Sequence, residues 1–247
     1  NFADKANAAS KFISAEIVKS MGLPLRKDLP AGQTSGNLLE VFTKEYLEQS
    51  FAHLSHLRPG NWVFYVGGRV ESFEQYEHLS DLGKALEKHP ELRTTIGEYI
   101  IAPDIIVSRQ SVTDEEINAL DNILDDETIV KHSPLRAKNT QKPLLHASIS
   151  CKWTIRSDRS QNSRTEALNL IRHRKGNTPH IAIVTAEPTP NRIASIALGT
   201  GDIDCVYHIA LPELVNAAKI YRDESVFDMV NMLVDGKRLR DISDLVF

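Results

Sequence analysis

The sequence predicts an α/β fold in which a mixed β-sheet is flanked by helices. Apolar stretches of strand length, such as residues 99–107 and 180–186, alternate with stretches whose apolar residues recur at helical spacing. Such alternation of strands and helices is typical of α/β proteins. Of the 247 residues, 41% are hydrophobic and 25% are charged, which is ordinary for a globular protein and sufficient for a sizeable core. We expect a single domain over residues 1–247.

The N-terminal part predicts two helices, a strand and a third helix. Residues 8–21 have helical spacing and are followed by a glycine and a proline that end the helix. Ser35 is a suitable cap for a second helix, whose apolar face consists of Leu38, Leu39, Phe42, Tyr46 and Leu47. A short strand at residues 62–66 ends at two glycines, and the charged stretch 72–96 predicts a helix.

An acidic residue interrupts the near-continuous apolar strand predicted at residues 99–107. Asp104 has apolar neighbours on both sides, with Pro103 directly before it. A lone buried carboxylate is costly, so Asp104 must be paired, protonated or bound to a cation. Pro103 removes a hydrogen-bond donor from the ladder and indicates a strand edge or bulge. We therefore expect Asp104 to open into a cleft.

The second half of the chain continues the alternation. Residues 111–143 are rich in charge, with a helical stretch at 114–124 and a basic, turn-prone tail. Thr189 and Pro190 form a cap and a first-turn proline for a helix that places Arg192 in its opening turn. The remaining predicted elements are strands at residues 180–186 and 203–210 and helices at 212–221 and 226–234.

The stretch from Leu144 to Arg174 joins a strand to a helix and carries much of the chemistry. Apolar and small residues alternate with polar ones up to Trp153, and this period of two predicts a strand. Lys152 lies near its end on the polar face, where it would deliver an ammonium group to the floor of a cleft. The spacing then becomes helical around Glu166. The residues between strand and helix include Arg156, Ser157, Asp158 and Arg159.

Charge and cysteine content restrict the partners and the compartment. The formal net charge is −4, but residues 152–175 contain seven Lys and Arg against two acids, and such a local field can attract a polyanion. Cys151 and Cys205 each lie in an apolar run, so we expect reduced thiols and no disulfide. No apolar run reaches the ~18 residues of a membrane span, and no secretory signal opens the chain. We expect a soluble, cytoplasmic protein without membrane contact.

Asp104, Ser150, Lys152 and Glu166 are candidate catalytic residues. Two carboxylates can hold Mg²⁺ through oxygen ligands, while a lysine beside them orients a water or stabilises the phosphate during hydrolysis. This combination indicates phosphodiester hydrolysis. An acid followed by a strand ending in acid-x-lysine is similar to the PD-(D/E)xK nucleases, except that Ser150 stands where that pattern has its second acid.

The residues that follow make the resemblance more specific. Ser150-Cys151-Lys152, the cluster at 156–159, Glu166 and the stretch 185–192 together resemble the NgoMIV-type restriction endonucleases, which cut around a CCGG core. The resemblance implies a restriction-endonuclease-like core with a central mixed sheet. It also implies a type II site-specific deoxyribonuclease that makes Mg²⁺-dependent double-strand cuts and leaves 5′ overhangs.

The same resemblance implies a role for each candidate catalytic residue. Asp104 and Glu166 are metal ligands, with Glu166 replacing the missing acid of the strand. The backbone carbonyl of Cys151 is a further candidate ligand. Lys152 acts at the attacking water and the scissile phosphate. The supporting residues are Ser150 and Glu40.

The arginine, aspartate and arginine at residues 156–159 suit a core of G and C bases. Each arginine can bind O6 and N7 of a guanine in the major groove, and the aspartate can accept from cytosine N4. By the family resemblance, Arg192 reads an outer guanine, Asp4 accepts from its cytosine partner, and Gln33 makes a minor-groove contact. With Arg192 and Asp4 in these roles, the favoured site is GCCGGC.

Double-stranded DNA with a palindromic site requires a two-fold symmetric protein, because each half-site must meet the same residues. We therefore expect a homodimer, and the resemblance implies a homotetramer made of two dimers that holds two DNA sites. The charge-rich segment 111–143 is our candidate for part of the dimer–dimer contact. The choice between dimer and tetramer, and the number of metal ions, stay open.

Several of these residues also fit ordinary structural roles. Asp158 with Gln161, and Ser163 with Glu166, match the capping-box pattern at a helix start. The arginines could form a solvated face, and Lys152 could extend its ammonium group into solvent. Two other functions fit the same residues: a repair or junction nuclease that reads DNA shape, and a DNA-binding module that does not cut.

Overall fold

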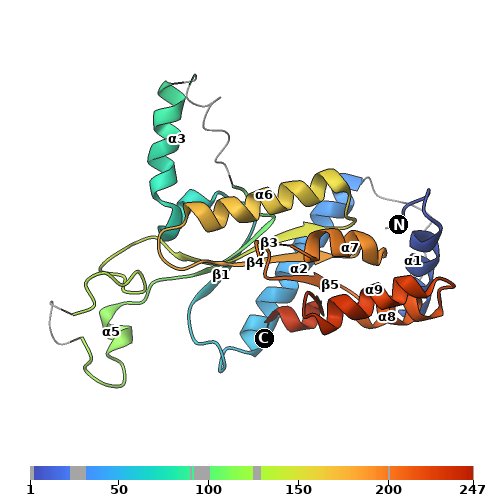
Figure 1. Ribbon diagram of the computed structural model, residues 1–247. Helices are drawn as coiled ribbons and strands as arrows, with labels where there is room; N and C mark the ends of the chain where they lie inside the picture. The colour runs from blue at the N-terminus through green and yellow to red at the C-terminus, as the bar shows by residue number, and fades with distance from the viewer. Residues whose placement is uncertain are drawn as a thin grey trace. The chain divides into compact units, whose positions relative to one another are not determined.

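The computed structural model describes residues 3–22, 32–89, 91, 101–124, 129–199 and 201–246, without the side chains of residues 32, 33 and 157–160 (Figure 1). The chain forms two compact units. The first unit consists of Asn1–Leu47, Ile149–Leu168 and Ile181–Phe247. The second unit consists of Glu48–Ser148 and Asn169–His180. The expectation of one domain over residues 1–247 stays a prediction.

Helices and strands alternate along the chain, as predicted for an α/β fold. As far as the second strand, the elements are α1 (Ala8–Ser20), α2 (Gly32–His53), β1 (Trp62–Val66), the 3₁₀ turns η1 (Val70–Ser72) and η2 (Glu74–Tyr76), α3 (His78–Lys88) and β2 (Ile105–Arg109). The following elements are α5 (Asp114–Ile117), β3 (Leu144–Lys152), α6 (Ser157–His173), β4 (His180–Thr185), α7 (Pro190–Ala197), β5 (Cys205–His208), α8 (Leu211–Ile220), α9 (Glu224–Asp235), β6 (Leu239–Asp241) and η3 (Ile242–Val246). The predicted mixed sheet flanked by helices is confirmed, with the strand order β1-β2-β3-β4-β5-β6.

Strand direction changes within the sheet. In the second unit, β1 and β2 are antiparallel, and Phe64 lies opposite Val107. In the first unit, β4, β5 and β6 are parallel, and Val206 of β5 lies opposite Ile183 of β4 and Leu239 of β6. Parallel neighbours need a crossover connection, which α7 supplies between β4 and β5. The chain therefore passes from the carboxyl end of β4 almost directly into α7.

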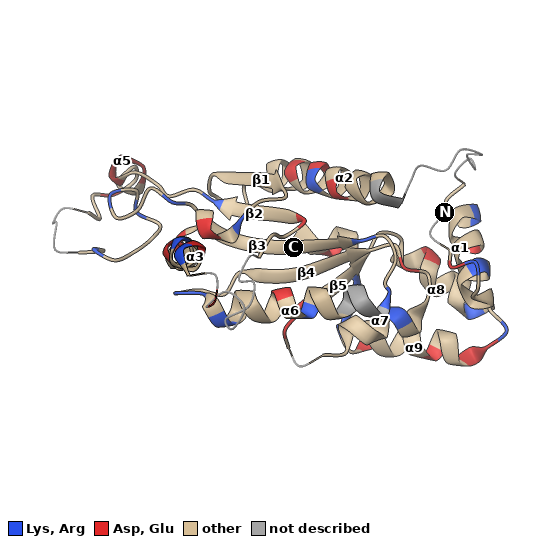
Figure 2. Cartoon of the chain, turned by 90° about the horizontal axis from the view of Figure 1, so that it is seen from above, with Lys and Arg blue, Asp and Glu red and all other residues tan. Residues whose placement is uncertain are grey.

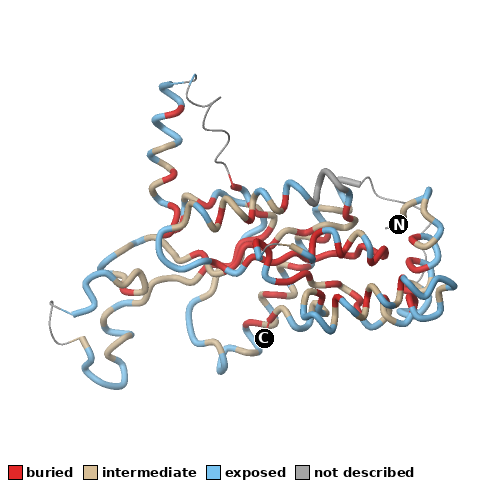
Figure 3. Tube along the Cα trace, in the orientation of Figure 1, coloured by how far each residue is buried: buried red, intermediate tan, exposed pale blue. Residues whose placement is uncertain are grey.

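Apolar helix faces form much of the core of the first unit. α8 packs against α1 and α9, and α7 packs against β5 and α9. α1 buries Ile13 and Ile17, and burial of one such side chain contributes about 1.5–3 kcal/mol. Figure 3 shows buried positions along β4 and α7, whereas Figure 2 shows residues of both charge signs along α1, α2 and α8. Within the described ranges, no helix has the length and apolar character that a membrane span would require.

Asp104 does not lie in the middle of a strand, as the sequence had suggested. β2 begins at Ile105, so Asp104 precedes it, and its side chain is half-buried. The Asp104 carbonyl accepts a hydrogen bond from the N–H of Gly67 at 2.8 Å. Because its side chain retains contact with solvent, this carboxylate is not the fully buried charge that a mid-strand position would have required.

Other boundaries also differ from the prediction. α2 begins at Gly32, so Ser35 lies inside the helix and does not cap it. The predicted helix 72–96 begins instead with two 3₁₀ turns, and its final residues lie outside the described part of the chain. Within these turns, the Gln75 side-chain amide donates to the Leu145 carbonyl at 2.8 Å and accepts from the Leu145 N–H at 2.9 Å, which ties the second turn to β3.

The helix predicted at residues 114–124 is much shorter in the structure. α5 ends at Ile117, where Asn118 turns its side chain back onto the following main chain. The Asn118 Oδ1 atom accepts from the N–H groups of Ile123 at 3.0 Å and Leu124 at 2.8 Å. Such side-chain bonds offer the main chain an alternative to helical hydrogen bonds, and here they end the helix after one turn.

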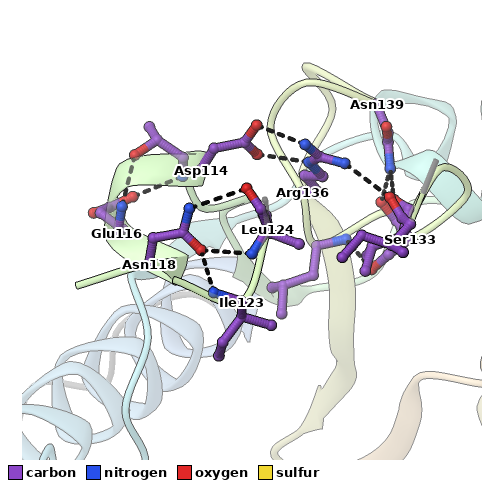
Figure 4. Close-up of polar contacts among 12 residues, drawn as sticks. Asp114, Glu116, Asn118, Ile123, Leu124, Ser133, Arg136 and Asn139 are labelled. Atoms are coloured by element: carbon purple, nitrogen blue, oxygen red, sulfur yellow. Dashed lines mark hydrogen bonds and ion pairs between the residues drawn. The ribbon is translucent and has the colours of Figure 1, made fainter. Parts of the chain in front are cut away.

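A charged pair fixes the shape of this charge-rich segment (Figure 4). The Arg136 side chain is almost fully buried, and its Nε and Nη2 atoms donate to the two Asp114 carboxylate oxygens at 2.6 and 2.7 Å. Arg136 Nη1 also donates to the Ile129 carbonyl at 3.1 Å. A two-point bond between guanidinium and carboxylate fixes both distance and angle. The turns at either end of residues 114–136 are thereby held together.

We predict that Asp114→Asn loosens residues 112–139 without unfolding the rest of the chain. The substitution leaves the buried guanidinium of Arg136 with a weaker, uncharged partner. Amide hydrogen exchange followed by mass spectrometry should show faster exchange in this segment and unchanged exchange in β4 and β5.

Glu115→Gln is the matched control, because it makes the same change of charge at an exposed neighbouring position. It should leave exchange in the segment as in the original chain. Equal effects of the two substitutions would show that net charge, and not the bond to Arg136, controls the segment.

Candidate functional site

The end of β3 has the predicted alternation, with Lys152 as its last residue. Ile149 and Cys151 are buried, while Ser150 and Lys152 are half-buried, so the last residues of the strand alternate between two faces. The Lys152 carbonyl accepts a hydrogen bond from the Thr185 hydroxyl at 2.6 Å. The main chain that carries the lysine is thereby held by β4.

Glu166 lies on α6 and is half-buried. Since α6 runs from Ser157 to His173, both Ser163 and Glu166 lie in its interior. The capping-box interpretation of this pair is therefore wrong, because a capping box requires a helix start at the serine. Asp158 likewise follows the first residue of α6, so its backbone position is also inside the helix.

The predicted metal ligands are partly exposed carboxylates on separate elements. Asp104 belongs to the second unit, whereas Glu166 and Glu40 belong to the first and are half-buried. Among the residues that the structure describes, no three His, Cys, Asp or Glu side chains gather in a way that could hold a metal. Mg²⁺ is usually bound through one or two carboxylates, with waters completing its shell. Two carboxylates are thus chemically sufficient for Mg²⁺, and ligation by these residues stays a prediction.

Asp4 and Arg192 form an ion pair although they lie 188 residues apart in the sequence. The Arg192 guanidinium donates to a carboxylate oxygen of Asp4, and each side chain is 31% exposed. Arg192 lies in the first turn of α7, as predicted, where its N–H donates to the Thr189 carbonyl at 3.0 Å. The other carboxylate oxygen of Asp4 accepts the Ala6 N–H at 3.0 Å. The local main chain therefore holds the Asp4 carboxylate and the backbone of Arg192, and both side chains remain accessible.

A further positive charge, that of Arg156, acts on Asp4 in this pair. The hydrogen bond from Arg192 holds the pKa of Asp4 below its ordinary value, the Ala6 N–H adds to the effect, and the charges of Arg192 and Arg156 lower it further. Arg156 is exposed at the residue before α6. The first unit thus brings together three predicted DNA contacts from three distant segments of the sequence.

The pair has the chemistry needed to recognise a G·C base pair. In the major groove, guanine presents two acceptors and its cytosine partner presents one donor. A guanidinium beside a carboxylate presents donors and acceptors in the complementary arrangement. The predicted roles of Arg192 and Asp4 are therefore chemically consistent with their position in the structure.

Glu187 is a buried acid that the sequence analysis did not select. Its side chain has no exposed surface. One carboxylate oxygen accepts from the Ile155 N–H at 2.8 Å and the other from the Thr189 N–H at 2.9 Å, while Arg192 lies 3.9 Å away. Burial raises the pKa of Glu187, and the two N–H groups and Arg192 oppose that rise. In the sequence, an acid directly after the mostly apolar stretch 181–186 was the signal that could have identified it.

His208 is also buried, and its environment determines its tautomer. Its Nδ1 accepts from the Ala210 N–H at 3.1 Å, so the proton lies on Nε2, which donates to the Glu187 carbonyl at 3.2 Å. Burial lowers the pKa of His208 to about 4. The imidazole is therefore neutral at pH 7 and fixes the main chain at Glu187.

Three predicted DNA contacts have side chains outside the described residues. These residues are Gln33, Asp158 and Arg159.

Comparison with known proteins identifies similar sequences over the whole chain. The model of the NgoMIV restriction enzyme family matches residues 1–247. The Type II restriction enzyme NgoMIV of Neisseria gonorrhoeae is 51% identical over 249 aligned residues, which cover 98% of this chain and 87% of that protein. The crystal structure of the Type IIF restriction endonuclease Bse634I with cognate DNA matches with a TM-score of 0.43 and 18% identity, covering 92% of this chain and 84% of that chain. A second Bse634I structure has a TM-score of 0.39 and 15% identity, covering 91% and 81%.

We predict that the low pKa of His208 makes the fold sensitive to acid. The unfolded chain binds a proton near pH 6.5, whereas the folded chain does so only near pH 4. Stability therefore falls as the pH falls through this window, by about 3 kcal/mol in total from this group. The imidazole resonances of His208 should show a titration midpoint near pH 4 in NMR spectra.

The variant His208→Phe provides the comparison, because it lacks the titrating group. Its stability at pH 7 should be lower, since the buried Glu187 carbonyl and Ala210 N–H lose their partners. Its stability should also fall less than that of the original chain between pH 7 and pH 5 in urea unfolding. A titration midpoint near pH 6.5 for His208 would contradict this account.

Proposed function

Because this chain belongs to the NgoMIV restriction enzyme family, we propose that it cuts double-stranded DNA at palindromic sites with a CCGG core. As a member of that family it is a type II restriction endonuclease, a site-specific deoxyribonuclease. The favoured site that we propose is GCCGGC. Cleavage depends on Mg²⁺ and leaves 5′ overhangs.

The ion pair between Asp4 and Arg192 is the observation that best supports this choice of site. Both side chains are accessible, and residues 188 positions apart in the sequence contribute them to the same place in the first unit. In the proposed complex, Arg192 donates to O6 and N7 of the outer guanine, and Asp4 accepts from N4 of its cytosine. One such pair in each half-site specifies the outer base pairs of GCCGGC.

The inner bases are assigned to the segment that opens α6. Arg156 and Arg159 each bind a guanine, and Asp158 accepts from a cytosine. A good two-point contact discriminates against a wrong base by ~1–3 kcal/mol. Gln33 contacts the minor groove, where A·T and G·C pairs differ only by the guanine amino group.

The catalytic roles follow the family pattern. Restriction endonucleases generally use a divalent metal, and we assign its ligands to Asp104 and Glu166, with the Cys151 carbonyl as a third oxygen donor. The metal supplies a Lewis acid and lowers the pKa of a bound water. Lys152 donates to the scissile phosphate and orients the attacking water. The supporting residues are Ser150 and Glu40.

A palindromic site requires two copies of the chain related by two-fold symmetry. We propose a homodimer on each site and a homotetramer that holds two sites, with the segment 111–143 in the dimer–dimer contact. Leu120 is 96% exposed and Ile123 is 58% exposed in this segment. Exposed apolar side chains on a segment held in shape by a buried ion pair are suited to an interface.

We expect plasmid DNA with a single GCCGGC site to be linearised with Mg²⁺ and left intact with EDTA. Plasmids with ACCGGT, which keeps the core, or GCGCGC, which keeps the outer pairs, should be cut far more slowly. Sequencing of the ends should give one position in each strand and a 5′ overhang.

Three other outcomes would exclude this proposal. Random nicking would contradict sequence recognition, and a preference for branched junctions over the linear site would favour a nuclease that reads DNA shape. Binding without cutting under all metal conditions would indicate a module that recognises DNA without hydrolysis.

Glu166→Gln should retain site-specific binding and lose Mg²⁺-dependent cleavage, because the amide is a poor metal ligand. A loss of roughly 10²-fold or more is the scale for one electrostatic catalytic group. Binding to labelled duplex in EDTA and cleavage with Mg²⁺ separate the two effects.

Glu213→Gln is the matched control, since Glu213 is also a half-buried glutamate on a helix of the first unit. It should leave both binding and cleavage unchanged. Full cleavage by the Glu166→Gln variant would remove Glu166 from the metal site.

A further inference from the structure

Glu187 connects two segments that the proposed function assigns to DNA reading. Its carboxylate accepts the main-chain N–H of Ile155, the residue before Arg156, at 2.8 Å. It also accepts the main-chain N–H of Thr189, the N-cap residue of α7, at 2.9 Å. These two bonds use different carboxylate oxygens, so one side chain spans both segments.

The main chain of Glu187 is also held by hydrogen bonds at both its N–H and its carbonyl group. Its N–H donates to the Thr185 hydroxyl at 3.1 Å, and its carbonyl accepts from His208 Nε2 at 3.2 Å. The same Thr185 hydroxyl donates to the Lys152 carbonyl at 2.6 Å. A continuous set of hydrogen bonds therefore runs from the strand end at Lys152, through Glu187, to both reading segments.

We propose that Glu187 is a positioning residue for base recognition, which sets the place of Arg156 relative to Arg192 without touching DNA. This inference rests on the proposed function, because it needs those arginines to read bases. The inner and outer bases of one half-site have a fixed separation in the duplex. Two readers on separate segments can match that separation only if the segments are held together.

A carboxylate fits this role better than its closest replacements. In Glu187→Gln, an NH₂ group replaces one of the two oxygens. This group cannot accept a hydrogen bond, so the N–H of either Ile155 or Thr189 loses its acceptor. In Glu187→Asp, the charge stays but the shorter side chain cannot reach both N–H groups. Both substitutions should release one reading segment while keeping both arginines in the sequence. Glu187→Gln also removes the carboxylate charge 3.9 Å from Arg192, whereas Glu187→Asp keeps a charge.

The test is binding of the full chain to three duplexes in EDTA, so that no cleavage interferes. One duplex carries GCCGGC, one has its outer pairs changed, and one has its core changed. A changed base pair should cost the original chain roughly 5- to 150-fold in affinity. Glu187→Gln should lose most of this discrimination, whereas its affinity for the duplex with changed outer pairs should stay close to that of the original chain.

Asp241→Asn is the matched control. Its carboxylate also accepts two main-chain N–H groups in the first unit, from Leu211 at 3.2 Å and Ser243 at 3.0 Å, but neither belongs to a reading segment. It should lower the urea midpoint and leave the affinity ratios unchanged. Thr185→Val, which removes the hydroxyl that accepts the Glu187 N–H, should shift the ratios in the same direction as Glu187→Gln and serves if that variant does not fold.

These measurements distinguish failure of the positioning role of Glu187 from failure of the proposed function. Lost discrimination in the Glu187 or Thr185 variant, with the Asp241 variant unaffected, supports the positioning role. Unchanged ratios in a folded Glu187→Gln or Thr185→Val variant overturn it and leave the proposed function standing. If the original chain itself fails to distinguish the three duplexes, both are overturned.

Discussion

A carboxylate with no exposed surface imposes a strict constraint on the first unit. Burial of Glu187 is tolerable because N–H groups from Ile155 and Thr189 bond to its two oxygens and Arg192 lies nearby. If either segment moved away, a buried acceptor would lose its partner. The segment before α6 and the N-cap of α7 are therefore held together by their shared bonds to Glu187, in addition to apolar packing. Separating them would leave a buried carboxylate oxygen without a hydrogen-bond donor.

The ion pair between Asp4 and Arg192 contributes much less to stability than the buried hydrogen bonds of Glu187. Asp4 and Arg192 are each about one-third exposed, and exposed ion pairs contribute only about 0–1 kcal/mol to stability. Such a pair can exchange its internal contact for contacts to base edges at little cost to the fold. The first unit thus combines fixed hydrogen bonds at Glu187 with an ion pair that can change partners. Such a combination suits a protein that must position its base-reading residues and also bind DNA with them.

The second unit uses a buried charge for a separate purpose. Arg136 is almost fully buried and bonds through two atoms to Asp114. The pair closes a segment that has little regular secondary structure, since Asn118 ends α5 after one turn. Side-chain bonds of this kind hold the shape of a segment that has few helical hydrogen bonds. Apolar side chains such as Leu120 remain on the surface of this segment.

Periodicity along the sequence was sufficient to predict α1, the alternating end of β3 at Lys152 and the placement of Arg192 in the first turn of α7, because these features depend on near neighbours in the chain. Motif order was sufficient to predict the family. Local patterns could not show that Asp104 precedes β2, or that α5 stops at Ile117, because hydrogen bonds to the main chain decide where an element ends. The contact between Asp4 and Arg192 and the central place of Glu187 join residues that are 188 and 32 positions apart. Such contacts have no periodic signature, and they exist only once folding has buried Glu187 and brought the N-terminal segment to the start of α7.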